Sequence, residues 1–412
     1  MKNYADLALL YGGENVAAQT ERYNNLARRF AEAFPAQGAP RFFSAPGRTE
    51  ISGNHTDHQF GRVLAASVNL DTIAAARENG GSVVNIHSEG YAPIRVDLSN
   101  LTPVPEEIGT TAGIIRGCAA YMREAGFTVG GFDATVTSTV FSGSGLSSSA
   151  AFEILINKIF DCLFNAGDLD AALSARIAQK SENNFFGKPS GLMDQTASSV
   201  GGMVAIDFEK PEAKIEALNY DFAAKGYELA IIGTGSSHDD LTDAYAAIPR
   251  EMREVAAFFG EERLRPVSPE AFYAKLPELY GKVSDRAILR AMHFFDENER
   301  VPQQVEALRN DDLPRFLRLV IESGESSWKL LQNIYATEKE QSLAIALALT
   351  ARILRDCGGA WRVHGGGFAG TILAFVPHAK MPEYREKLDA VFGKGACVPL
   401  QIRPVGAAEV KL

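Results

Sequence analysis

The stretch Phe141–Ala150 reads Phe-Ser-Gly-Ser-Gly-Leu-Ser-Ser-Ser-Ala and has the residue types that bind a phosphate group. Glycines let the backbone approach a ligand closely, and the free amides at the start of a helix attract an anion. The stretch differs from the nucleotide motifs GxxxxGK(S/T) and GxGxxG. Because no lysine follows it, a triphosphate bound here would depend on a metal ion. The structural alternative, a serine-rich helix cap, is the less favoured interpretation.

A second stretch, 44–61, concentrates polar side chains between glycines. Imidazole and carboxylate groups at this spacing are potential metal ligands, although the pattern is a weak sign of a metal. They also suit the neighbouring hydroxyls of a sugar, because a carboxylate accepts hydrogen bonds and an imidazole donates or accepts them. A purely structural polar turn is the third interpretation. The polar residues concerned are Arg48, Asn54, His55, Asp57 and His58.

Two further stretches place glycines beside residues that can do chemistry. Lys188–Gln195 reads Lys-Pro-Ser-Gly-Leu-Met-Asp-Gln and follows Glu182. Its Asp194 lies in an apolar segment, where a carboxylate needs a partner or changes its pKa. A helix cap is the structural alternative for Asp194. Trp361–Gly370 contains four glycines before a predicted strand, and taken alone it favours a bulged hairpin.

The elements predicted around these stretches include strands in both halves of the chain, which favours an α+β protein over a doubly wound parallel sheet. Alternating apolar residues at 132–140 predict a strand before the glycine–serine stretch, and helical spacing at 151–166 predicts a helix after it. A turn at Gly90 predicts a hairpin of 82–87 with 94–98. Other strands are expected at 63–76, 203–208, 227–232, 361–376 and 396–403, and other helices at 111–125, 169–183 and within 240–357.

In this order, the four stretches together resemble the GHMP kinase superfamily and, within it, the galactokinases. They are similar to the galactose-binding signature, the ATP motif, the segment of the catalytic aspartate and the C-terminal glycine motif. A fifth segment is similar to the one that brings a tyrosine to the sugar. The matching segments are APGR (45–48) with GNHTDHQFG (53–61), SGSGLSSSA (142–150), PSGLMDQ (189–195), HGGGFAG (364–370) and SHDDLTDAY (237–245). The resemblance extends over about residues 40–375.

The resemblance implies a two-lobed fold with the active site in the cleft between the lobes. The N-terminal lobe would be similar to domain 2 of ribosomal protein S5, and the C-terminal lobe would be α/β. A Pro/Gly segment near residue 38 and the charged stretch 209–214 suggest the divisions. We expect a helical N-terminal extension at 1–38, an N-terminal lobe at 39–214 and a C-terminal lobe at 215–412.

The resemblance also implies how ATP and Mg²⁺ would be bound. Ser149 and Glu182 would hold Mg²⁺, which bridges phosphate oxygens and offsets their charge. The residues that would surround the ATP phosphates are Gly143, Ser144, Gly145, Leu146, Ser147, Ser148 and Ser149.

For catalysis, the resemblance implies a pair of charged residues. Asp194 would face the hydroxyl to be phosphorylated, which is the anomeric C1 hydroxyl in galactokinases. Arg48 would lie between Asp194 and the γ-phosphate, keeping the carboxyl ionised and stabilising charge in the transition state. The backbone of Gly365–Gly367 would approach the substrates. The residues that would bind the sugar are Asn54, His55, Thr56, Asp57 and Tyr245.

One departure from the family leaves the identity of the sugar open. Galactokinases usually read Arg-Val-Asn-Leu-Ile-Gly-Glu-His-Thr-Asp-Tyr, whereas this chain reads Arg-Thr-Glu-Ile-Ser-Gly-Asn-His-Thr-Asp-His at 48–58. The family glutamate at the position of Asn54 is a sugar ligand. Asparagine keeps an acceptor oxygen and adds a donor, but it removes the charge. With His58 in place of tyrosine, recognition at C6 of the sugar is the point most affected.

Three functions therefore follow from the resemblance. The leading one is an ATP-dependent kinase of the C1 hydroxyl of galactose. The second is the same chemistry on L-arabinose, N-acetylgalactosamine or galacturonate. The third is a sugar-sensing regulator that binds ATP and sugar without effective catalysis. The complete serine run Ser147–Ser149 and the presence of both Arg48 and Asp194 argue against the regulator.

Composition excludes several other classes for these 412 residues. The net charge of −10 argues against a general binder of nucleic acid or acidic membranes, which needs clustered Lys and Arg. The four cysteines form no CxxC pair, so neither a zinc knuckle nor a redox motif is expected. No secretion signal is expected, and the apolar runs are shorter than the roughly 18–20 residues that span a bilayer. We expect a cytoplasmic monomer or weak homodimer whose partners are a sugar and Mg-ATP.

Overall fold

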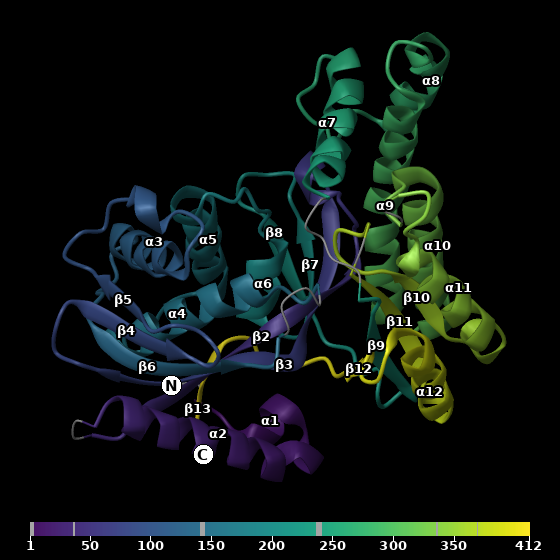
Figure 1. The fold of residues 1–412 in the computed structure, drawn as a ribbon. Helices are drawn as coiled ribbons and strands as arrows, with labels where there is room; N and C mark the ends of the chain where they lie inside the picture. The colour runs from purple at the N-terminus through teal and green to yellow at the C-terminus, as the bar shows by residue number, and fades with distance from the viewer. Residues whose placement is uncertain (1–3, 36–37, 141–144, 236–240, 335–336, 369) are drawn as a thin grey trace.

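The computed structural model describes residues 4–412 apart from 36–37, 141–144, 236–240, 335–336 and 369. Strands among these residues form a larger and a smaller sheet, which lie in different lobes (Figure 1). Helices accompany both sheets, and neighbouring strands pair mostly antiparallel. The predicted α+β class is confirmed.

The larger sheet has nine strands and includes both ends of the described chain. Its spatial order is β1 (Tyr4–Ala5), β13 (Ala408–Val410), β2 (Arg41–Ser52), β3 (Arg62–Glu78), β6 (Phe132–Ser138), β4 (Val83–Ser88) and β5 (Ile94–Asp97). Strand β7 (Met203–Asp207) pairs with β3, and β8 (Lys214–Leu218) pairs with β7. The smaller sheet has the order β10 (Ala360–Val363), β11 (Thr371–Pro377), β9 (Tyr227–Gly233) and β12 (Cys397–Leu400).

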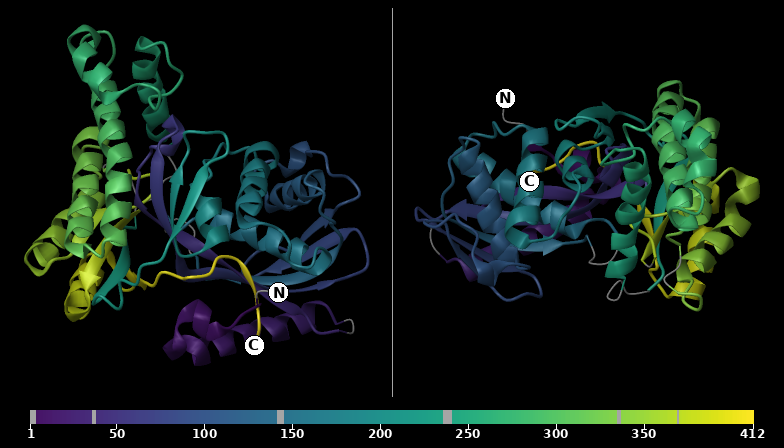
Figure 2. Two further views of the ribbon diagram at one scale, coloured as in Figure 1. Left: turned by 180° about the vertical axis from the view of Figure 1, so that it is seen from behind. Right: turned by 90° about the horizontal axis from the view of Figure 1, so that it is seen from above.

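Helices cover both faces of the larger sheet, as the views in Figures 1 and 2 agree. One face carries α1 (Leu7–Tyr11) and α2 (Val16–Ala33). The other carries α3 (Thr111–Glu124), α4 (Ser148–Phe164), α5 (Ala171–Ser181) and α6 (Met193–Val200). The C-terminal lobe contains α7 (Thr242–Phe258), α8 (Pro269–Leu279), α9 (Asp285–Arg309), α10 (Leu313–Ser326), α11 (Ser342–Leu354) and α12 (Met381–Phe392). Within the described ranges, no helix is both long and apolar enough to cross a membrane.

Strand β3 is apolar along much of its length because it is buried on both faces. Ile73 and Ala75 belong to the core formed with α1 and α2, whereas Ala74 and Ala76 belong to the core beneath α3 and α4. Successive side chains of a strand point to opposite faces, so burial on both sides requires an unbroken apolar run. The two N-terminal helices therefore complete the burial of this sheet.

A buried cluster of charges joins these helices to the sheet at Asp71 of β3. Its carboxylate accepts hydrogen bonds from Arg22 Nη1 at 2.6 Å, from Arg403 Nη1 at 3.1 Å and from the Tyr11 hydroxyl at 2.5 Å. Burial alone would raise the pKa of Asp71, but the charges of Arg22 and Arg403 lower the pKa below its ordinary value. Asp71 thus connects α1, α2, β3 and the segment before β13.

One hydrophobic core is shared by the two lobes. It combines Ile51 and Leu64 of the larger sheet with Leu373 and Phe375 of the smaller sheet, and Phe316 of α10 packs with them. Strand β2 leads into this junction, and its pairing with β3 is irregular on either side of Arg48. The polar residues at the end of β2 therefore lie where the N-terminal lobe contacts the C-terminal lobe.

The pairing of strands refines the expected division of the chain. We propose that residues 4–33 belong to the N-terminal lobe, because α2 buries one face of its sheet. We also propose that this lobe extends through β8 to residue 218 and includes β13 from the C-terminal end of the chain, because both strands pair within the larger sheet. The C-terminal lobe would then extend from about 219 to about 402.

The cluster at Asp71 predicts a large effect on stability. Asp71→Asn is expected to lower the free energy of unfolding by roughly 3–5 kcal/mol, because it leaves the buried guanidinium of Arg403 and the largely buried one of Arg22 without their shared carboxylate. Urea unfolding at pH 7 measures this. Asp311→Asn is the matched control, since that carboxylate is exposed and its partners among the described residues are Lys225 and the partly buried Tyr220. An unfolding midpoint for Asp71→Asn as high as that of the control would contradict the prediction.

Candidate active site

The glycine–serine stretch leads from β6 into α4, as predicted. Helix α4 begins at Ser148, and Ser147 immediately before it has a left-handed backbone with φ of 59°. Gly145 is also left-handed, and a side chain at this position would come within 3 Å of His364 and Thr371 in the C-terminal lobe. Gly143 and Ser144 lie outside the described residues. The described part brings the start of α4 to the junction of the lobes, and the first amides of a helix have no partner within the helix itself.

Arg48 and Asp194 form a two-pronged ion pair beside this helix start. Arg48 Nε and Nη2 donate to the two carboxylate oxygens of Asp194, each at 2.6 Å, and Ser147 Oγ donates to Oδ2 at 2.6 Å. Arg48 also donates to the Gly145 carbonyl, and its backbone amide donates to the Leu146 carbonyl at 3.0 Å. Two segments that are 146 positions apart in the chain meet here.

The pair keeps the Asp194 carboxyl ionised. Burial would raise the pKa of Asp194, but the charge and hydrogen bonds of Arg48, together with the Ser147 hydroxyl, lower the pKa below its ordinary value. The side chain of Asp194 is still 29% exposed, whereas that of Arg48 is 9% exposed. A ligand can therefore reach the carboxylate while its arginine partner is held in place.

Ser149 and Glu182, the predicted metal ligands, are neighbours in the structure. Ser149 Oγ donates to Glu182 Oε1 at 3.4 Å. Glu182 begins η4 (Glu182–Phe186), a π-helical turn that follows α5, and its side chain is only 3% exposed. The same Oε1 atom accepts a hydrogen bond from Lys188 Nζ at 3.0 Å. A hydroxyl, a carboxylate and an ammonium thus meet beside the start of α4.

A second carboxyl group, Glu153, lies behind Glu182. The side-chain amide of Gln195 donates to Glu153 Oε2 at 3.1 Å and to Glu182 Oε2 at 2.9 Å, so it bridges the two. Burial, followed by the charge of Glu182, raises the pKa of Glu153 well above its ordinary value. Burial beside Glu182 therefore makes Glu153 harder to ionise than an exposed glutamate. Glu153 was not predicted from the sequence, although its position one helical turn after Ser149 places both on one side of α4.

Two of the predicted sugar ligands, Asn54 and Thr56, are buried and form hydrogen bonds within the protein. Asn54 is 0% exposed, and its side chain donates to Glu50 Oε1 at 2.8 Å and to the Gly365 carbonyl at 2.7 Å. Its Oδ1 accepts from Asn333 Nδ2 at 2.8 Å. The Thr56 hydroxyl is also fully buried and bonds to backbone carbonyls. A direct sugar contact by Asn54 or Thr56 therefore has no support in this geometry.

The remaining predicted sugar ligands surround the glycine triplet Gly365–Gly367. His55 Nε2 lies 3.0 Å from the Gly366 carbonyl, and the Tyr245 hydroxyl donates to the Gly367 carbonyl at 2.7 Å. Burial, and then His58, lower the pKa of His55 to about 4, so this imidazole is neutral at pH 7. Asp57 lies against Gly191, where any side chain would clash with its carboxylate. Asp57 thereby faces the segment that carries Asp194.

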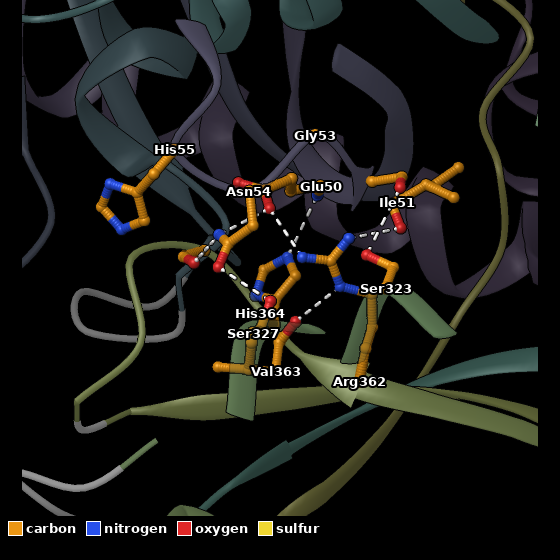
Figure 3. Close-up of polar contacts among 12 residues, drawn as sticks. Glu50, Ile51, Gly53, Asn54, His55, Ser323, Ser327, Arg362, Val363 and His364 are labelled. Carbon is orange, nitrogen blue, oxygen red and sulfur yellow. Dashed lines mark hydrogen bonds and ion pairs between the residues drawn. The ribbon is translucent and has the colours of Figure 1, made fainter. Parts of the chain in front are cut away.

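Figure 3 shows a buried polar network beneath this triplet. Arg362 donates to Glu50 Oε1 at 3.0 Å and to the Ile51 carbonyl at 2.8 Å, and the Glu50 backbone amide donates to His364 Nε2 at 3.3 Å. Burial raises the pKa of Glu50 to about 7 even though Arg362 and Arg48 oppose this. The network was not predicted, because its members lie more than 300 positions apart in the chain.

The structure thus brings most of the predicted site residues together in two groups. Arg48, Asp194 and Glu182 gather with the described loop residues at the start of α4. His55 and Tyr245 gather at the glycine triplet, with Asp57 toward Gly191. Ser148 opens α4 between Ser147 and Ser149, and Leu146 contributes its carbonyl to Arg48.

Comparisons with known proteins place two family signatures on these residues. The galactokinase galactose-binding signature matches residues 28–78, and the N-terminal domain of the GHMP kinases matches residues 113–202. The first range contains Arg48 and the polar stretch after it. The second contains the glycine–serine stretch, Glu182 and Asp194.

Whole-chain relatives agree with the signatures. A galactokinase of Actinobacillus pleuropneumoniae serotype 5b is 34% identical over 366 residues, which is 87% of this chain and 90% of the relative. A galactokinase of Clostridium tetani is 29% identical over 377 residues, or 90% and 92% of the two chains. The crystal structure of Lactococcus lactis galactokinase with galactose has a TM-score of 0.80 at 25% identity, covering 94% of this chain and all of that one. Methanococcus jannaschii mevalonate kinase shares the fold, with a TM-score of 0.63 at 16% identity over 89% and 99% of the chains.

Proposed function

The chain belongs to the galactokinase family, and we propose that it transfers the γ-phosphoryl group of ATP to the C1 hydroxyl of galactose, producing galactose 1-phosphate and ADP. The GHMP kinase fold expected from the sequence is confirmed, and ATP is the co-substrate in this family. The observation that carries the proposal is the ion pair of Arg48 and Asp194. It joins Arg48, within the galactose-binding signature, to Asp194, which Ser147 holds beside the start of α4, where phosphate would bind.

We assign Arg48 and Asp194 to catalysis by position and charge. Phosphoryl transfer depends mainly on alignment and on stabilising charge at the transferred group. The low pKa of Asp194 makes it a weak base, because proton acceptance is most effective near the working pH. Asp194 would therefore orient the sugar hydroxyl, and Arg48 would stabilise charge on the phosphoryl group.

The phosphates of ATP would lie against the loop Gly143–Ser149. Amides at the start of α4 point toward an anion placed there, and the helix dipole favours negative charge at this end. At Gly145 there is no room for a side chain beside His364, which supports close contact between the loop and the C-terminal lobe. The nucleotide would thus bind where the lobes meet.

Mg²⁺ fits the residues at this position. Magnesium is usually bound by one or two carboxylates together with phosphate oxygens and water, and Ser149 with Glu182 supplies a hydroxyl and a carboxylate. Among the described residues, no group of three or more His, Cys, Asp or Glu side chains forms a separate metal cage. When bound, Mg²⁺ would offset the charge of the phosphates. The amide of Gln195, which also donates to Glu153, would hold Glu182 in place for it.

We propose His55, Asp57 and Tyr245 as the residues that bind the sugar hydroxyls. Neutral His55 both donates and accepts hydrogen bonds, and the carboxylate of Asp57 accepts them. Each of these side chains is at least partly exposed, in contrast to Asn54 and Thr56. Asn54 favours the second candidate, a kinase of another sugar, because this position now presents a buried amide where the family has a charged sugar ligand.

A panel of sugars tests the proposed function. Production of ADP is coupled to an optical assay with galactose, L-arabinose, N-acetylgalactosamine and galacturonate as acceptors. We expect galactose to give the highest kcat/KM. Turnover of another sugar without turnover of galactose would favour the second candidate. Binding of galactose and ATP without release of ADP would identify a regulator instead.

Asp194→Asn is expected to lower kcat roughly a thousandfold, because the amide cannot hold Arg48 and the sugar hydroxyl as an ionised carboxylate does. The affinity for the sugar should change by less than about tenfold, since other residues supply most of its contacts. Steady-state kinetics with calorimetry of sugar binding measures both. Asp356→Asn, an exposed aspartate beyond α11, is the control and should behave as the unmodified protein does. Turnover of Asp194→Asn close to that control would reject the assigned role.

Glu182→Ala is expected to raise the Mg²⁺ concentration needed for half-maximal activity by at least about tenfold, because a carboxylate ligand is lost. The measurement is a Mg²⁺ titration at saturating ATP. Glu322→Ala, which removes an exposed glutamate of α10, serves as the matched control. Thermal unfolding of both variants separates a loss of metal binding from a loss of fold. An unchanged Mg²⁺ titration for folded Glu182→Ala would count against Glu182 as a ligand.

A further inference from the structure

Lys188 supplies a positive charge beside the phosphate loop, although it is not part of that loop. The sequence of the loop has no lysine, which left the charge of a triphosphate without a lysine partner. In the structure, Lys188 Nζ lies 3.0 Å from Glu182 Oε1, and this oxygen also accepts the hydrogen bond from Ser149 Oγ. The ammonium of Lys188 thus lies next to the Ser149 hydroxyl and the Glu182 carboxylate.

The other cation of the site is already engaged. The guanidinium of Arg48 is bound at both prongs by Asp194 and also donates to the Gly145 carbonyl. Its side chain is 9% exposed, so it has little freedom to move toward a ligand. Lys188 differs, because its ion pair with a described residue is with Glu182 alone and its side chain is 60% exposed. A lysine ammonium on a flexible four-carbon stem can exchange one anionic partner for another.

Lys188 carries a positive charge at neutral pH, because the ordinary pKa of a lysine is about 10.4. A divalent cation at Ser149 and Glu182 would meet this like charge at close range. Lys188 and a metal ion held by Glu182 would therefore share the oxygen Oε1, and Lys188 would lose its partner when that oxygen binds the metal.

We propose that Lys188 is a phosphate-binding residue of the nucleotide site. It pairs with Glu182 while no metal is bound, and it contacts a phosphate of the nucleotide once the metal has taken its place at Glu182. The ammonium would then supply a positive charge that the loop itself, which has no lysine, does not supply. This inference rests on the proposed function, because it takes the start of α4 as the ATP site.

The test uses two binding measurements on the full chain, neither of which requires a sugar. Lys188→Met should weaken the binding of Mg-ADP, measured by calorimetry, by tenfold or more, because an ammonium–phosphate contact is lost. The same variant should bind Mn²⁺ alone, measured by electron paramagnetic resonance without nucleotide, at least about threefold more tightly, because the competitor at Glu182 is gone. Opposite changes for these two ligands distinguish the exchange from a structural role.

Lys188→Arg and Lys180→Met are the controls. The arginine variant keeps the charge and should retain most of the affinity for Mg-ADP. Lys180 is an exposed lysine of α5 that contacts Glu124 and Tyr121, so its removal should change neither measurement. The proposal is overturned if Lys188→Met binds Mg-ADP within twofold of the unmodified protein, or if Mn²⁺ binding does not tighten. Failure to phosphorylate galactose would reject the proposed substrate but would leave both measurements interpretable.

Discussion

The buried guanidinium of Arg362 is the contact on which the arrangement of the site depends. It is 0% exposed and joins the C-terminal lobe to the end of β2 through Glu50 and the Ile51 carbonyl. Removing one partner of a buried ion pair costs about 3–5 kcal/mol, so such a contact holds its two segments in one geometry. Strand β2 also carries Arg48. The same strand therefore sets both the junction of the lobes and the position of the charge that faces Asp194.

Much of the fold and the central part of the site could be predicted, because both depend on local patterns. The strand at 132–140 and the helix from 151 correspond to β6 and α4, and the predicted hairpin is β4 with β5. Two segments of the site have distinctive residue spacings that can be recognised without knowing any long-range contact. They are the glycine–serine loop between β6 and α4 and the segment of Asp194. The pairing of Arg48 with Asp194 followed from the resemblance, and its two-pronged geometry followed only from the structure.

The parts that could not be predicted depend on contacts between distant segments. Asn54 lies among polar residues and glycines, which locally suggests an exposed ligand, but Asn333 and Gly365 enclose it from the other lobe. Lys188 gave no signal in the sequence, because its role depends on which oxygen of Glu182 it reaches. The pairing of residues 408–410 with the larger sheet could not be predicted from the sequence either, since a short apolar strand can pair with any free edge.

The place of β13 between β1 and β2 has a consequence for how the protein is made. Arg41 and Glu409 form an ion pair although 368 positions separate them, and β1 pairs with the sheet through β13. Domains usually fold as units in the order in which the ribosome produces them. Here the N-terminal lobe has to wait, with one strand edge uncovered, until residues 408–410 have left the ribosome. During translation this edge of β2 stays unpaired, and unpaired strand edges invite association with other chains.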